Sequence, residues 1–179
     1  MDELIDILDE SGNYSGTTAL KSEAHKHGWF HATVHIWLYT KDERILLQQR
    51  GASKKTYPGL WDVSVAGHIH AGESIEDAAI REIEEEVGLR VQESDLQKIA
   101  VRKGMRSHPN GIQDNEYYHV FLVELTTELT NLKKQDEEVD DLQLFDLSIL
   151  KSTNEQFPLV PNTSEYYQFI VENIQTILQ

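Results

Sequence analysis

The chain has 179 residues, 39% of them hydrophobic, which suffices for one domain with a buried core and is too short for two. Its formal net charge of -15 excludes a broad basic surface for extended nucleic acid or anionic membranes, so an anionic substrate would need divalent cations as a bridge. Cysteine is absent, which excludes disulfides and thiolate chemistry, and without a basic leader or a long apolar run we expect a cytoplasmic protein with no membrane contact.

The first third of the chain has the composition of strands and turns. Apolar and polar residues alternate over 4–9, and the turn chemistry of Ser11-Gly12-Asn13 follows, which predicts a hairpin within an N-terminal extension, residues 1–24. A tight turn at Lys41-Asp42-Glu43 separates two further strands, and Pro58-Gly59 closes a loop that begins at Ser53. The strands expected after the hairpin are residues 33–39, 45–49 and 61–66.

The clearest helix covers residues 75–87. Ser74 and Asp77 form a variant of the capping box at its start, and Gly88 is suited to a left-handed C-cap at its end. Strands are expected at 117–125 and 142–145, and apolar residues at helical spacing predict a packing helix within 164–179. Strands mixed with two unlike helices favour an α/β or α+β sandwich with a mixed sheet, formed by a single domain over 1–179.

Three glutamates share one face of the helix at 75–87. Glu82, Glu85 and Glu86 stand at i, i+3 and i+4, within an arc of roughly 100°, beside the apolar stripe that contains Ile83 and Val87. A solvated acidic surface is the alternative. Against it, Glu82 and Glu86 repel each other and all three lie near the negative end of the helix dipole, and a bound cation would reverse both effects.

The stretch from Gly67 to Leu89 resembles the Nudix box without any departure from its pattern. The matching positions are Gly67, then after five residues Glu73, then after seven residues Arg81-Glu82-Ile83, and finally Glu85-Glu86-Val87-Gly88-Leu89. The resemblance implies a Nudix-type α/β/α sandwich in which the box forms a loop, a helix and a loop. It also implies that Glu82, Glu85 and Glu86 bind Mg²⁺ or Mn²⁺.

The same resemblance assigns Glu73 and Arg81 to a pair that holds the loop against the helix. Hard cations held by carboxylates polarise a pyrophosphate and activate water, so the expected enzyme is a hydrolase of acid anhydrides. The carboxylate that removes the proton of the water stays open, with Glu116 and Glu138 as candidates outside the box.

Beyond the box the chain is similar to type 1 isopentenyl diphosphate isomerases and their hydrolase-like relatives. In those isomerases a second metal constellation matches His31, His68, Asp114 and Glu116 here, with His25 or His27 near the remaining histidine. These histidines could instead be ordinary hydrogen-bonded residues. The position of the isomerase cysteine is Ala66, and the box glutamates are intact, so hydrolysis is favoured over isomerisation.

The basic residues Arg50, Lys54 and Lys55 are expected to bind the diphosphate, with simple solvent exposure as the alternative. The predicted partner is therefore a small diphosphate, either nucleoside or isoprenoid, bound by a monomer or homodimer. Two other functions stay open. One is isopentenyl diphosphate isomerase activity, and the other is ligand sensing by a Nudix domain without turnover.

Overall fold

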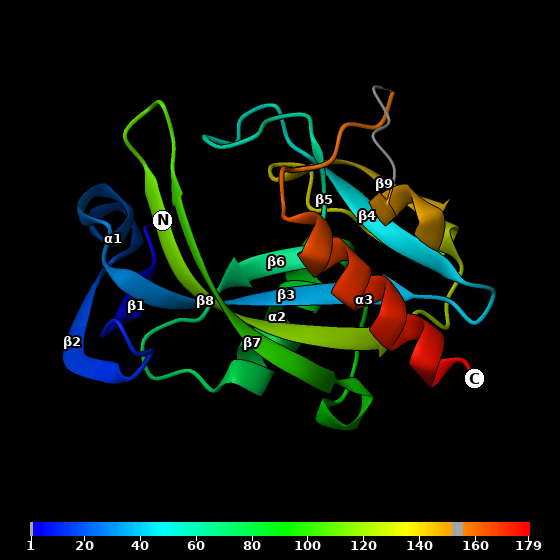
Figure 1. The fold of residues 1–179 in the computed structure, drawn as a ribbon, viewed down its shortest axis with the longest axis horizontal. Helices are drawn as coiled ribbons and strands as arrows, with labels where there is room; N and C mark the ends of the chain where they lie inside the picture. Colours follow the sequence, from blue (N-terminus) through cyan, green and yellow to red (C-terminus); the bar gives the residue numbers. More distant parts are fainter. Residues whose placement is uncertain (1, 152–155) are drawn as a thin grey trace.

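Strand β3 (Phe30–Tyr39) is the centre of the fold in a computed structural model that describes residues 2–151 and 156–179. It pairs with β8 (Gln113–Glu124) in parallel along its whole length and with β6 (Val65–His68) in antiparallel over residues 33–36. The remaining strands are β1 (Leu4–Leu8), β2 (Tyr14–Leu20), β4 (Arg44–Arg50), β5 (Trp61–Asp62), β7 (Gln97–Ser107) and β9 (Val139–Asp146). Together they form one mixed sheet (Figure 1).

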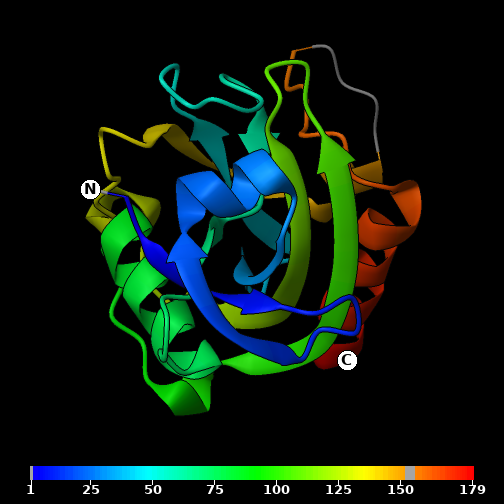
Figure 2. The same ribbon diagram turned by 90° about the vertical axis from the view of Figure 1, so that its left-hand side faces the viewer.

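Two helices cover opposite faces of this sheet, as Figure 2 shows. They are α2 (Ile75–Val87) and α3 (Ser164–Ile177). Because side chains alternate along a strand, the odd and even residues of β3 serve different layers. Val34, Ile36 and Leu38 are buried with α2, whereas Trp37 and Tyr39 are buried with α3. This confirms the predicted sandwich with a mixed sheet.

Strands β1 and β2 form the predicted N-terminal hairpin, and β1 also pairs with the start of β3. The chain then forms a short helix, α1 (Lys21–His27), which the sequence analysis does not include. Strand β7 is also absent from it, because this edge strand alternates polar and half-buried residues and has a weak apolar signal. Strands β8 and β9 both begin earlier than predicted.

The single strand predicted over 61–66 is wrong, since Val63 and Ser64 interrupt it. Ser64 Oγ accepts the N–H of Leu38 from β3 and donates to the carbonyl of Leu46 from β4. A side chain thus bridges β3 and β4, whose only backbone pair is Tyr39 with Ile45 among the described residues. The chain on either side of Ser64 therefore joins different neighbours, β5 with β4 and β6 with β3.

The helices of the described part of the chain include none that is both long and apolar enough to cross a membrane.

Candidate functional site

Helix α2 has the bounds that place its glutamates together. Ser74 Oγ accepts the N–H of Asp77 at 3.0 Å, and Gly88 ends the helix at φ +67° with its N–H bonded to the carbonyl of Glu84. Glu82 and Glu86 are buried, with 9% and 3% exposure, while the Glu85 side chain is 52% exposed. Of the three glutamates on this face of α2, two are therefore buried and one lies at the surface.

Strand β6 approaches α2 so closely that only glycine fits at residue 67. A Cβ atom on Gly67 would lie 1.9 Å from Cδ of Glu82. The missing side chain lets the Glu82 carboxylate lie flat against the strand. The glycine of the box is thus explained by the packing of one carboxylate.

Arg81 joins the loop, the helix and β6. Its Nε and Nη2 donate to the two oxygens of Glu73 at 2.8 and 2.9 Å, a bidentate pair. Its Nη1 donates to Glu82 at 2.7 Å and to Glu85 at 3.2 Å, and Nη2 also reaches the carbonyl of His68 at 2.9 Å. The structure therefore places the predicted Glu73 and Arg81 pair in direct contact and ties it to two glutamates of the helix.

The surroundings of Glu86 disfavour its ionised form. Burial, reinforced by the negative charge of Glu82, raises the pKa of Glu86 to about 8. Gln48 Nε2 donates to its carboxylate at 2.8 Å and the N–H of Ala66 at 3.2 Å, but no lysine or arginine pairs with it among the described residues. A divalent cation would supply the missing positive charge, so the donor set fits one.

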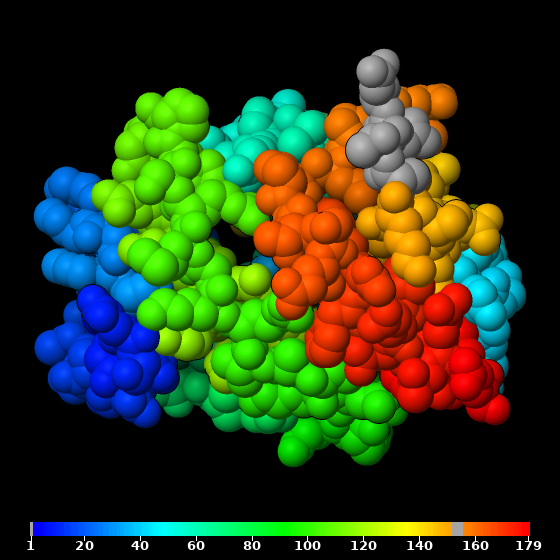
Figure 3. Space-filling view, in the orientation of Figure 1, coloured from blue at the N-terminus to red at the C-terminus, as the bar shows by residue number. Residues whose placement is uncertain are grey.

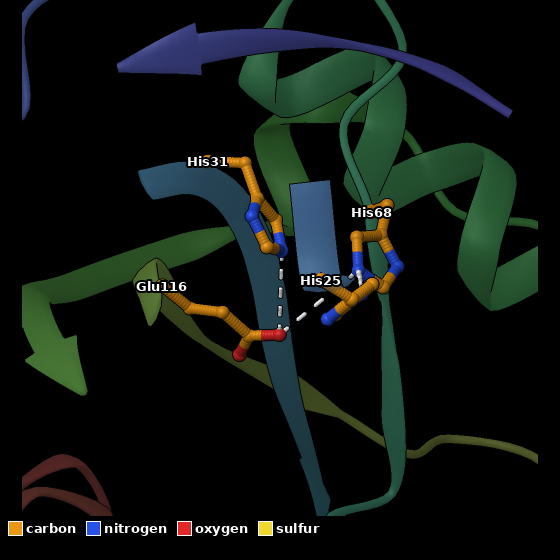
Figure 4. Close-up of side chains that lie close together, drawn as sticks. All are labelled: His25, His31, His68 and Glu116. Carbon is orange, nitrogen blue, oxygen red and sulfur yellow. Dashed lines mark hydrogen bonds and ion pairs between the residues drawn. The ribbon is translucent and has the colours of Figure 1, made fainter. Parts of the chain in front are cut away.

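A second cluster lies where α1, β3, β6 and β8 meet (Figure 4). One ligand atom from each of four residues lies within 4.8 Å of all the others. The strand register explains this, since His31 is opposite Glu116 and Thr33 is opposite His68. The four residues are His25, His31, His68 and Glu116.

The geometry of these four side chains fits a cation. His31 Nδ1 lies 2.9 Å from the carbonyl of Trp29, which can only accept, so Nδ1 carries the hydrogen and Nε2 presents a lone pair. Nε2 is buried without a hydrogen-bond partner, 3.6 Å from Glu116 Oε1. The Nε2 atoms of His25 and His68 lie only 3.1 Å apart, and burial lowers the pKa of His68 well below its ordinary value. Imidazole nitrogens that converge in this way are a donor set suited to a metal ion.

Asp114 stands beside this cluster and not within it. One oxygen lies 2.9 Å from His25 Nδ1, outside hydrogen-bond geometry, and the other accepts from His108 Nε2 at 2.7 Å. Of the two candidate histidines, the structure places His25 in the cluster. His27 stacks on Trp29 and contacts Glu23 at the surface.

The predicted basic residues do not form a free anion site. Arg50 Nη1 donates to Asp62 at 2.7 Å, Lys54 pairs with Glu138, and Lys55 is exposed. The positive charge of Lys54 nevertheless offsets part of the rise in the pKa of Glu86 and adds to the fall in the pKa of His68. Its charge therefore acts on both the glutamates of α2 and the histidine cluster.

Lys21 was missed by the sequence analysis. It pairs with Glu3 at 3.0 Å and also lowers the pKa of His68. No local pattern marks this lysine, because its position depends on the pairing of β1 with β2 and on where α1 begins.

Comparison with known proteins gives a match to the family described as the NUDIX domain over residues 29–167. An uncharacterized Nudix hydrolase of Clostridium acetobutylicum is 34% identical over 77% of this chain and 67% of its own length. An isopentenyl-diphosphate Delta-isomerase of Salmonella arizonae is 36% identical over 79% and 76%. Nudix hydrolase 3 of Arabidopsis thaliana is 36% identical, but the chain spans only 16% of it.

Solved structures share the fold at low sequence identity. A protein of Deinococcus radiodurans superposes with a TM-score of 0.69 at 17% identity, covering 93% of this chain and 98% of the other. The NUDIX domain of Shewanella oneidensis NrtR, complexed with ADP ribose, gives 0.58 at 19% identity, covering 83% and 88%.

The Glu73 and Arg81 pair should act as a unit. Replacing Glu73 by Gln or Arg81 by Ala should lower the melting temperature, because each change removes the bonds between the loop and α2. In the double variant the loss should be clearly smaller than the sum of the single losses. Thermal denaturation of the four proteins measures this, and full additivity would show that the two residues are independent.

Glu86 should make stability depend on pH in the absence of metal. Its pKa is raised from 4.5 to about 8 on folding, so the folded chain binds this proton more tightly than the unfolded chain. The contribution to stability is complete below the lower value and is lost as the pH rises through the higher one.

Urea unfolding in the presence of a chelator, at about pH 5.5 and about pH 8, tests this dependence. The Glu86→Gln variant should gain stability relative to the wild type at the higher pH, since its amide does not ionise. An equal difference at both pH values would contradict the assignment.

Proposed function

Because the chain belongs to the Nudix family, we propose that it hydrolyses the pyrophosphate linkage of a small diphosphate, with divalent cations held by Glu82, Glu85 and Glu86. The observation that carries this proposal is the buried pair Glu82 and Glu86, which lacks a sufficient counter-charge. Mg²⁺ or Mn²⁺, when bound, would polarise the diphosphate and make a bound water more acidic.

The three glutamates have different surroundings and therefore different parts in this proposal. Glu86 is oriented by Gln48 and the N–H of Ala66, and Glu82 by Arg81. Glu85 shares Arg81 but is half exposed, so it can meet a ligand that arrives from solvent. A single nitrogen of Arg81 thus holds the Glu82 and Glu85 carboxylates in one region.

Two carboxylates outside the box are candidates to accept the proton of the attacking water. Burial alone would raise the pKa of Glu116, but the nearness of His31 outweighs this and lowers the pKa below its ordinary value, so the carboxylate is ionised. Glu138 is held ionised in the same manner by Lys54. Both are present as bases at neutral pH, and Glu138 is released only if Lys54 moves to the substrate.

Arg50 and Lys54 can bind a diphosphate if its oxygens replace the carboxylates with which these residues now pair. Arg50 and Lys54 are already desolvated in part and oriented by Asp62 and Glu138. Phosphate oxygens that enter the site would compete for these donors, and Lys55 adds charge at the surface. The histidine cluster would hold a second cation, and its imidazole-rich donor set suits Mn²⁺ better than Mg²⁺.

Isopentenyl diphosphate isomerisation is the second candidate function. It is favoured by the similarity to the Salmonella isomerase and by the histidine cluster. Against it stands Ala66, which offers no group that can protonate an alkene.

Glu85→Gln and Glu86→Gln should each lower kcat by about 100-fold or more, because the amide keeps the size but loses the charge that holds the cation. Glu84→Gln is the matched control, since Glu84 is on the same helix but pairs with Arg90 at the surface. The assay is phosphate release from a panel of nucleoside and isoprenoid diphosphates with Mg²⁺ or Mn²⁺. Undiminished turnover by both box variants would refute the metal assignment.

Ala66→Cys should not convert the protein into an isomerase, because a general acid contributes only about 10²–10⁴-fold and only within reach of the carbon that it protonates. Incubation with isopentenyl diphosphate, followed by chromatography for the dimethylallyl isomer, measures the outcome. A clear rate above the parent would instead make an isoprenoid diphosphate the natural ligand.

A further inference from the structure

His35 belongs neither to the glutamates of α2 nor to the histidine cluster. Its side chain lies on the same face of β3 as that of His31, a member of the histidine cluster. His35 is two residues beyond Thr33 and stands opposite Ala66 in the pairing of β3 with β6. Its ring stacks on Tyr118 of β8, with centroids 4.5 Å apart and planes 15° from parallel. The backbone of Ala66 in turn donates to Glu86 at 3.2 Å. His35 is therefore opposite the residue of β6 whose backbone binds Glu86.

Helix α3 determines which nitrogen of His35 carries the hydrogen. The indole N–H of Trp37 can only donate, and it donates to the hydroxyl oxygen of Tyr166 at 3.1 Å. Tyr166 is buried, and its hydroxyl has one other neighbour among the described residues, His35 Nδ1 at 3.0 Å. The hydroxyl hydrogen must point at Nδ1, because otherwise it would be buried without a partner. Nδ1 thus accepts, and the hydrogen of the neutral ring is on Nε2.

The Nε2–H of His35 is an available donor. It has no hydrogen-bond partner in the described part of the chain, yet it is not among the buried atoms that lack one, so it keeps contact with solvent. Burial lowers the pKa of His35, which keeps the ring neutral. Charged residues of both signs act on the ring. Asp62 and Glu116 are acidic, and Arg50 and Arg106 are basic.

The surface is hollowed beside elements that contact His35, namely β8 and the start of α3. Figure 3 shows a depression between the green atoms of β7 and β8 and the orange atoms of the segment before α3. Arg106 of β7 crosses to that segment and bonds to the carbonyl of Pro161 and to Asn162. Arg102 of β7 lies over the ring of Tyr166, so β7 also contacts the helix that orients His35.

We propose that His35 Nε2–H donates a hydrogen bond to an acceptor on the organic half of the substrate, so that this residue favours a polar organic half, such as a nucleoside, over a hydrocarbon one. This inference rests on the proposed hydrolysis of a diphosphate. A hydrocarbon chain at this place would remove water from the donor without replacing its bond, and the charged neighbours of His35 would lose hydration as well. A base carbonyl, a ring nitrogen or a ribose oxygen satisfies the donor.

The test is binding in the full-length protein with Ca²⁺ in place of Mg²⁺ to suppress turnover, measured by calorimetry. The ligands are the four common ribonucleoside diphosphates, dimethylallyl diphosphate and inorganic pyrophosphate. The wild type should bind at least one nucleoside diphosphate about tenfold more tightly than dimethylallyl diphosphate, the ratio expected for one satisfied donor. Pyrophosphate is the probe without an organic half.

Three variants locate the effect. His35→Phe keeps a ring on Tyr118 but lacks the donor, and it should weaken nucleoside diphosphate binding about tenfold while pyrophosphate binding is unchanged. His35→Gln restores an N–H and should recover most of the affinity, which a purely structural role would not allow. His119→Phe is the control, a half-buried histidine on the other face of β8.

An unchanged nucleoside diphosphate affinity in a folded His35→Phe protein would overturn the inference, as would an equal loss for pyrophosphate or tighter wild-type binding of the alkyl diphosphate. These results leave the proposed hydrolysis intact. If the wild type binds none of the diphosphates, the inference and the proposed function fall together. Normal turnover by both Glu85→Gln and Glu86→Gln, together with the expected His35 result, would refute the metal assignment of the proposed function and leave the inference intact.

Discussion

The guanidinium of Arg81 is the interaction on which the rest of the site depends. It bonds to the loop through Glu73, to its own helix through Glu82 and Glu85, and to β6 through the carbonyl of His68. One planar group thus sets the distance between three segments, and its fork shape makes the arrangement directional. Because His68 belongs to the histidine cluster, Arg81 also links that cluster to the glutamates of α2.

The burial of two acidic side chains near Arg81 is electrostatically unfavourable. Glu82 and Glu86 are buried close together, and burial raises the pKa of both. The apolar neighbours Ile83 and Val87, fully buried on the same helix, keep α2 docked in spite of this. Local instability that the core overrides is typical of a site built to be completed by a ligand.

Local sequence signals predicted what local chemistry determines, and little beyond it. Ser74 and Gly88 define α2 within the chain itself, so its acidic face could be derived from spacing. His25 and His27 could not be separated in this way, because the choice depends on how α1 packs against β8. The partners of Arg50 and Lys54 come from β5 and from the segment before β9, and His35 has its role only through a hydroxyl on α3. Such contacts across the fold leave no mark in a short stretch of residues.

The alternation of β6 has a consequence for how chains of this shape can diverge. Gly67 faces α2, and every other amino acid at this position would place an atom inside the Glu82 carboxylate. Ala66 faces the opposite layer, packs beside the α3 core and is only partly buried. Mutation is thus forbidden at one residue and open at the next. A substitution at residue 66 therefore changes the groups on one side of the strand while the contact of Gly67 with Glu82 on the other side is kept.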